Sequence, residues 1–257
     1  MKYFLLSFAL FFPLHFIFDR FSLENWNKSI SLKIKTILSS SFHQVDKHLN
    51  QFLVLLGKHP LLSGLYEKSV GLQKGYTLHK HTFLVLKQYM KYFAPHNLPK
   101  EMSHSSFLLL LALHDIGKPQ AVKEKKKFFQ HKYTCSIIKK LSKDLILINL
   151  PKTLSLVSSD VMGNFIKGKK SLEDTEKHIY FLADQANLSA KNFLSLLTTY
   201  YQADSGAYTK DAGGLPALDH LYKKKANQFL FNRLKERIEF SSNKEKLMKQ
   251  LEKNFSS

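Results

Sequence analysis

An adjacent histidine and aspartate, His114-Asp115, close an unbroken apolar run over residues 107–113. A run without a polar face is typical of a helix that is buried on all sides, and Gly117 followed by Pro119 predicts where that helix stops. Asp115 is then expected in the last helical turn, where the helix dipole disfavours a carboxylate. A nearby cation would reverse that penalty, and the neighbouring imidazole is a ready second ligand. We therefore interpret the pair as part of a metal site.

Three polar residues in other helical segments are candidate partners of this pair. His81 lies near the start of an amphipathic segment, His131 opens a further helix, and Asp204 closes the apolar stretch 193–203. Imidazoles and carboxylates are common ligands of divalent ions. A metal site would require such residues to meet although they are far apart in the chain.

The order of these residues resembles that of the HD superfamily of metal-dependent phosphohydrolases, whose ligands follow the order His, His-Asp, Asp. The resemblance covers residues 70–220 and rests on histidine-threonine before apolar residues, on the string from His114 to Pro119, and on alanine before Asp204. The string Phe128-Phe129-Gln130-His131 is similar to an aromatic-then-histidine element of HD domains attached to bacterial tRNA nucleotidyltransferases.

The resemblance implies an all-α fold, an HD-domain helical bundle with an N-terminal helical extension. It also implies a divalent metal cofactor of one or two ions, with Mn, Mg, Ni, Fe, Co and Zn not distinguished by these ligand types. The implied metal ligands are His81, His114, Asp115 and Asp204.

The implied catalytic residues are Asp115, Lys118 and His131. Asp115 could contact the ion or take the proton of an activated water, since adjacent helical residues diverge by about 100°. Lys118 or His131 could contact the substrate phosphate or the leaving oxygen. A solvated lysine and a helix-capping histidine remain equal alternatives for these two residues.

Departures from the family pattern narrow the expected substrate. The chain lacks the Gly-Tyr-Pro signature that follows the His-Asp pair in cyclic-dinucleotide enzymes, and no nucleotidyltransferase head precedes residue 70, so we do not expect a full tRNA-repair enzyme. Several relatives place another histidine where this chain has Asp160, which makes Asp160 a candidate auxiliary ligand. The favoured alternative is a cap for the helix that begins at Val161.

Composition favours a single large helical domain. The chain has 257 residues, of which 44% are hydrophobic, enough for one ample core, and its lone Cys135 excludes an internal disulfide framework. We divide it into an N-terminal apolar or helical extension packed on the core (1–69), an HD domain (70–220), and a basic C-terminal helix and tail (221–257), with residues beyond 240 exposed. Helices are expected over residues 23–56, 76–93, 104–117, 131–142, 171–186, 189–203 and 217–252.

A formal net charge of +19 calls for anionic partners. Basic runs occur at residues 123–127, 167–170 and 223–225, and each alone is best interpreted as solvated surface. Summed over the chain, the excess favours nucleotides, RNA or a phosphorylated surface. No motif supports sequence-specific DNA recognition.

Residues 3–18 are almost continuously apolar, although Ser7, Pro13 and His15 interrupt them. The stretch is short for a membrane span, and no small-residue cleavage site follows it. We favour a segment packed on the core, with peripheral membrane contact and a secretory signal as alternatives. Phosphate chemistry at a metal site is compatible with the cytoplasm, which we expect.

We therefore expect a metal-dependent phosphohydrolase, a phosphomonoesterase or phosphodiesterase, acting on a nucleotide or an RNA-end phosphoester by metal-activated water. The alternative is a non-catalytic HD protein that senses a nucleotide or binds nucleic acid. An intact set of ligand residues favours the enzyme. The oligomeric state does not follow from the sequence.

Overall fold

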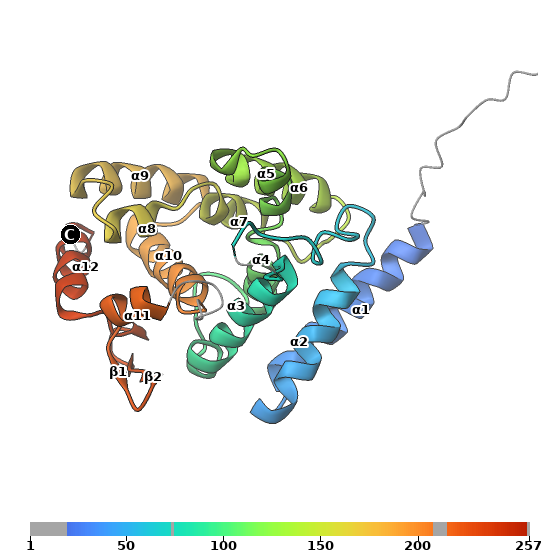
Figure 1. Ribbon diagram of the computed structural model, residues 1–257, viewed down its shortest axis with the longest axis horizontal. Coiled ribbons are helices and arrows are strands. Elements are labelled where there is room, and N and C mark those ends of the chain that lie inside the picture. Colours follow the sequence, from blue (N-terminus) through green and yellow to red (C-terminus); the bar gives the residue numbers. More distant parts are fainter. Residues whose placement is uncertain (1–19, 73–74, 208–214, 256–257) are drawn as a thin grey trace, which may run out of the picture.

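A computed structural model describes residues 20–72, 75–207 and 215–255, which fold almost entirely into helices (Figure 1). The apolar residues 3–18, and with them the three interpretations of that stretch, lie outside the described residues. Within the described ranges, no helix has both the length and the apolarity required to cross a membrane.

The first helical region is broken in two. The sequence predicts one helix over 23–56, but the structure has α1 (Arg20–Ser39) and α2 (Phe42–Leu56), which lie side by side (Figure 1). The break falls in a run of three serines, whose hydroxyls compete for backbone hydrogen bonds. Ser39 and Ser40 both bond carbonyls one turn earlier in α1, and Ser41 is extended and precedes α2.

The centre of the molecule is α4 (His104–Leu113), which packs against α3 (Leu78–Tyr92). Residues 107–113 of α4 are all buried, which confirms the prediction of a helix without a solvent face. The helix ends four residues before the predicted end at residue 117. Pro119 lies in the first turn of the next helix, α5 (Lys118–Lys123), where its missing N–H costs no hydrogen bond.

The chain continues through a 3-10 turn, η2 (Lys127–Phe129), and several further helices. These are α6 (Gln130–Leu141), α7 (Leu150–Val157), α8 (Val161–Ile166), α9 (Leu172–Gln185) and α10 (Ala190–Ser205). The Ser171 hydroxyl caps α9 and the Ser189 hydroxyl caps α10, each by accepting a backbone N–H three residues further on, which confirms both predicted helix starts.

The predicted helix over 217–252 and the predicted exposed tail beyond 240 are both wrong. The structure has α11 (Leu215–Leu221), two short antiparallel hairpins and α12 (Ser242–Asn254), and α12 buries Met248 and Leu251. In the hairpins, β1 (Lys224–Lys225) pairs with β2 (Gln228–Phe229) and β3 (Phe231–Asn232) pairs with β4 (Arg237–Ile238).

The second hairpin is fastened to α10 through one buried side chain. The Gln202 amide nitrogen donates to the Ile238 carbonyl, and the Ile238 N–H donates to the Gln202 carbonyl oxygen, both at 2.8 Å. Gln202 lies two residues before Asp204, so this pair of hydrogen bonds fixes the end of α10 that carries the carboxylate.

Candidate metal centre

Four side chains from three separate parts of the chain meet at one point. His81 projects from the first turn of α3, and Thr77 caps that helix through the Lys80 N–H. His114 ends α4, Asp115 follows it in the turn before α5, and Asp204 lies in the last turn of α10.

The Nε2 atom of His81 is the centre of this cluster. It lies 3.2 Å from His114 Nε2, 3.2 Å from Asp115 Oδ2 and 3.3 Å from Asp204 Oδ1. His114 Nε2 lies 3.7 Å from Asp115 Oδ2 and 3.5 Å from Asp204 Oδ1. Each of these side chains therefore directs a potential ligand atom toward the same small volume.

His81, His114 and Asp115 form a buried group that could hold a metal ion. Ligand bonds of about 2.1 Å place neighbouring ligand atoms about 3.0–3.4 Å apart, close to the separations found here. Asp204 Oδ1 also fits, because it is buried and makes no hydrogen bond of good geometry to any residue that the structure describes. An ion would satisfy that oxygen.

The other ring nitrogens hold both imidazoles in place. His114 Nδ1 donates to the Leu111 carbonyl at 2.7 Å, which leaves Nε2 without a proton when the ring is neutral. His81 Nδ1 lies 3.3 Å from the Tyr76 hydroxyl. Such outer partners fix the tautomer and orientation of metal-ligating histidines, so both rings are oriented for coordination through Nε2.

The charges of the cluster balance one another. Burial, the strongest influence, favours neutral imidazole, but the nearby Asp115 and Asp204 carboxylates together raise the pKa of His81 to about 9. Burial likewise opposes ionisation of both carboxyls, yet the cations around them lower their pKa values below the ordinary range. The two carboxylates therefore stabilise positive charge on His81 and on Lys118.

Lys118 is the second of these cations, and it pairs directly with Asp115. Its ammonium nitrogen lies 2.8 Å from Asp115 Oδ2, and its side chain is only 17% exposed. Burial works against the charged amine, but the Asp115 carboxylate raises the pKa of Lys118. The prediction that Asp115 lies in the last turn of a helix is wrong, because α4 ends at Leu113 and Asp115 lies in the turn before α5.

Gly117 allows this turn to lie against α6. Its N–H donates to the Thr134 hydroxyl at 3.1 Å, and a Cβ at this position would lie 2.2 Å from the Thr134 backbone nitrogen. The restriction is steric, since the glycine has φ of −85°, which any residue can adopt. Close approach of α6 therefore sets the position of Asp115 and Lys118.

We expect Gly117→Ala to destabilise the protein by about 1–3 kcal/mol, the usual cost of overpacking, because the added methyl must displace backbone. Gly57→Ala is the matched control, since a Cβ there meets atoms no closer than 3.5 Å, and it should change stability by less than about 1 kcal/mol. Denaturant unfolding of both variants measures the difference. Equal stabilities would contradict the close packing of α6 on this turn.

A cavity of about 90 Å³ opens beside the cluster. Among its lining residues are Asp115, Lys118, His131, Asp160, Tyr200 and Asp204. His131 Nδ1 donates to the Val157 carbonyl at 2.9 Å, so its Nε2 is left as the atom that can exchange a proton. His131 therefore borders the same space as the carboxylates without belonging to the ligand cluster.

Asp160 caps α8, as the favoured sequence interpretation predicts. Its Oδ1 accepts the Gly163 N–H at 2.9 Å, and Lys167 lies 3.6 Å from its other oxygen. Asp160 lines the cavity. The group of close ligand atoms found among the described residues comprises His81, His114 and Asp115, and Asp204 is joined to it by contacts of 3.3 and 3.5 Å with the two imidazoles.

We expect Asp160→Ala to cost about 1 kcal/mol through loss of this cap, whereas Asp160→Asn should retain the stability because asparagine caps equally well. Thermal unfolding of the two variants measures the cap. If Asp160→Asn lost metal affinity while keeping its stability, Asp160 would be an auxiliary ligand after all.

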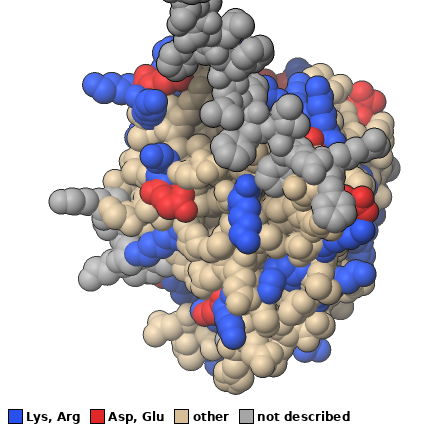
Figure 2. Space-filling view, turned by 90° about the vertical axis from the view of Figure 1, so that its right-hand side faces the viewer, with Lys and Arg blue, Asp and Glu red and all other residues tan. Residues whose placement is uncertain are grey.

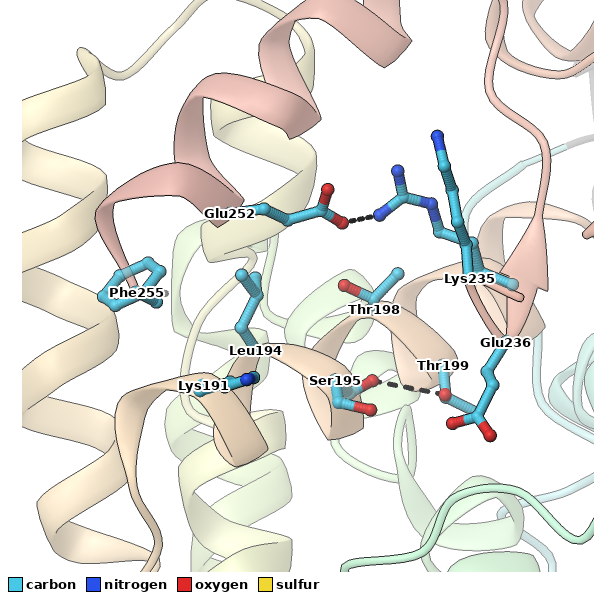
Figure 3. A pocket seen from close by; sticks show the side chains of 10 residues that line it. Lys191, Leu194, Ser195, Thr198, Thr199, Lys235, Glu236, Glu252 and Phe255 are labelled. Atoms are coloured by element: carbon cyan, nitrogen blue, oxygen red, sulfur yellow. Dashed lines mark hydrogen bonds and ion pairs between the residues drawn. The ribbon is translucent and has the colours of Figure 1, made fainter. Parts of the chain in front are cut away.

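A second cavity, of about 300 Å³, lies between α10, the β3–β4 hairpin and α12 (Figure 3). It is larger than the first, but its buried cation, Arg237, is already paired with Glu245 and Glu252. In Figure 3 the Glu252 carboxylate turns toward that guanidinium, while Thr198 and Thr199 line the opposite wall. Although the second cavity is larger, the ligand cluster beside the first cavity makes the first the better candidate for a functional site.

Basic side chains are scattered over one face of the molecule (Figure 2). Figure 2 shows the side of the molecule on which α1 lies, where Lys and Arg side chains are separated by uncharged surface rather than merged into one patch. This face gives no indication of a single extended anion-binding site.

Several residues that line the cavity are not predicted from the sequence, among them Tyr200, Tyr201 and Gln130. Tyr200 could have been found, since it lies four residues before Asp204 and such a spacing places two side chains on one helix face. Gln130 stands in the string that ends at His131, and this neighbour was the only signal for it, since a glutamine by itself is typical of a surface. Comparison of the chain with protein-family models, curated proteins and solved structures found no match.

Proposed function

We propose that this protein is a metal-dependent phosphohydrolase of the HD type, which acts on the phosphoester of a nucleotide or of an RNA end. One observation carries the proposal: two imidazole nitrogens and two carboxylate oxygens converge, with nitrogen–nitrogen and nitrogen–oxygen separations of 3.2–3.7 Å. They do so beside a cavity that also presents a lysine and a third histidine.

His81, His114, Asp115 and Asp204 would hold the ion. When bound, a divalent ion supplies Lewis-acid chemistry, which lowers the pKa of a water and neutralises charge on a phosphoryl oxygen. The rest of the reaction depends on side chains of this chain, which bind the phosphate, move protons and limit access of bulk water.

Lys118 and His131 have distinct parts in this proposal. The Lys118 ammonium group is fixed by Asp115 at 2.8 Å and borders the cavity, so it can bind a phosphate oxygen without reorganising. His131 Nε2 can give a proton to the leaving oxygen or accept one, because Nδ1 is committed to the Val157 carbonyl. Asp115, which also lines the cavity, can accept the proton of the attacking water.

The test is metal analysis of the purified full chain together with a screen of phosphoesters. Metal-free protein is reloaded separately with manganese, magnesium, nickel, iron, cobalt or zinc and assayed on nucleoside phosphates and on phosphorylated oligonucleotides. We expect hydrolysis that depends on one or more of these ions. Saturable nucleotide binding without turnover would replace the enzyme with a nucleotide sensor, and failure to bind any ion would refute the proposal.

A further inference from the structure

An exposed aromatic ring lies two residues before the wall of the cavity. Phe128 belongs to η2 and is 78% exposed, although phenylalanine is ordinarily among the buried residues. Its ring contacts that of Phe129, with centroids 4.3 Å apart and planes inclined at 41°, and most of its surface is open to a ligand.

Lysines surround this pair of rings. Lys126 and Lys132 place their ammonium groups 6.0 and 5.5 Å from the centre of the Phe129 ring, within the range of cation–π attraction. The acidic residue of the segment, Glu124, is already bonded by the Tyr133 hydroxyl. The exposed lysines near the rings are Lys123, Lys125, Lys126, Lys127 and Lys132.

The rings and the cavity are joined by the chain itself. Gln130 and His131, which line the cavity, directly follow Phe129. At 3.8 Å per residue, the Cα atoms of Phe128 and Gln130 are at most about 7.6 Å apart. The backbone that carries Phe128 therefore lies close to the wall of the cavity.

The cavity, of about 90 Å³, can admit a phosphoryl group. The base and the following nucleotides of a longer substrate would then lie on the neighbouring surface, where residues 123–128 are exposed.

We propose that residues 123–132 form a binding platform for a single-stranded nucleic-acid end, which stacks its terminal base on Phe128 and directs its terminal phosphate into the cavity. The following phosphates lie along the lysines of the segment. Stacking on an aromatic ring beside cations is how proteins bind single strands without sequence preference. This assignment rests on the proposed function for its account of the terminal phosphate, but the binding surface can be tested separately.

Fluorescence anisotropy on the metal-free full chain tests the platform. The probe is a ten-nucleotide oligoadenylate with a phosphate at one end and fluorescein at the other, prepared in both polarities. We expect Phe128→Ala to weaken binding about 5- to 150-fold, the loss of one stacked base, and Phe128→Trp to preserve it. Phe181→Ala, which removes another exposed phenylalanine (60% exposed), should bind like the parent chain.

Salt dependence tests the lysines. Each phosphate contact that is lost should lower the slope of log K against log salt by about 0.7 for a single strand, so Lys125→Ala/Lys127→Ala should lower it by about 1.4. The control pair Lys246→Ala/Lys253→Ala lies on α12, at the far left of Figure 1 and away from α5, and should leave the slope unchanged.

Equal binding by the parent chain and Phe128→Ala would overturn the platform, as would competition by adenosine monophosphate as strong as that by unlabelled oligoadenylate. If the oligonucleotide binds through Phe128 but no ion supports hydrolysis, the proposed function fails and the platform stands.

Discussion

Asp115→Asn should reduce ion-dependent phosphoester hydrolysis by at least about 100-fold, the usual minimum effect of removing a positioned proton acceptor. The substitution keeps the shape of the side chain but removes its charge, and with it a ligand of the proposed ion. Rates are measured per folded molecule in the presence of the most effective ion. Asp160→Asn is the control, because Asp160 lines the same cavity but serves as a helix cap, and it should hydrolyse substrate like the parent chain.

The same variant should also lose stability in the metal-free protein. Placement of Asp115 at a helix end would make its removal harmless, but the structure pairs it with Lys118 at 2.8 Å, with both side chains mostly buried. Leaving one partner of a buried pair alone costs about 3–5 kcal/mol. The double variant Asp115→Asn/Lys118→Met should recover part of the lost stability, which denaturant unfolding would reveal.

For the first of these two predictions, hydrolysis by Asp115→Asn at the parental rate would contradict the proposed mechanism.

Leu110→Ala should destabilise the protein by about 2–5 kcal/mol through a cavity in the central helix, while the molecules that remain folded keep their chemistry. Leu110 is 1% exposed and lies within residues 107–113 of α4, which are all buried and lead to the metal centre. The measurement is denaturant unfolding, with hydrolysis assayed well below the transition.

Leu234→Ala provides the matched control, because Leu234 is 97% exposed and surface substitutions usually change stability by less than about 0.5 kcal/mol. A loss of less than about 1 kcal/mol in Leu110→Ala would mean that α4 is less tightly packed than its burial indicates. A selective loss of activity in folded Leu110→Ala would mean that this helix does more than support the site.

The helical fold class and the central helix could be predicted because an apolar run of seven residues, with no polar face, is typical of a buried helix. The end of that helix could not, because Pro119 can begin a helix as well as end one. The hairpins after residue 223 were missed for a physical reason. Ala226, Asn227 and Glu236 adopt positive φ values of 49°, 60° and 52°, and none is the glycine that ordinarily marks such turns. Strands of two residues are also too short to show an alternating pattern.

The candidate site could be predicted in part. Its histidines and aspartates stand at the ends of apolar segments, where polar residues are conspicuous. The pairing of Asp115 with Lys118 depends on the turn between two helices. That turn depends on how closely α6 approaches Gly117, which no local pattern encodes.

The two hydrogen bonds between Gln202 and Ile238 affect where the chain could be shortened. A fragment ending at residue 220 would contain every proposed ligand and would match the extent of the family resemblance. It would also leave the Gln202 amide, which is 0% exposed in the whole chain, without either of its partners, two residues from Asp204. Water would then have to enter the protein beside Asp204 to form hydrogen bonds with the Gln202 amide. A smaller catalytic unit is therefore better designed by keeping the β3–β4 hairpin than by following the motif boundaries.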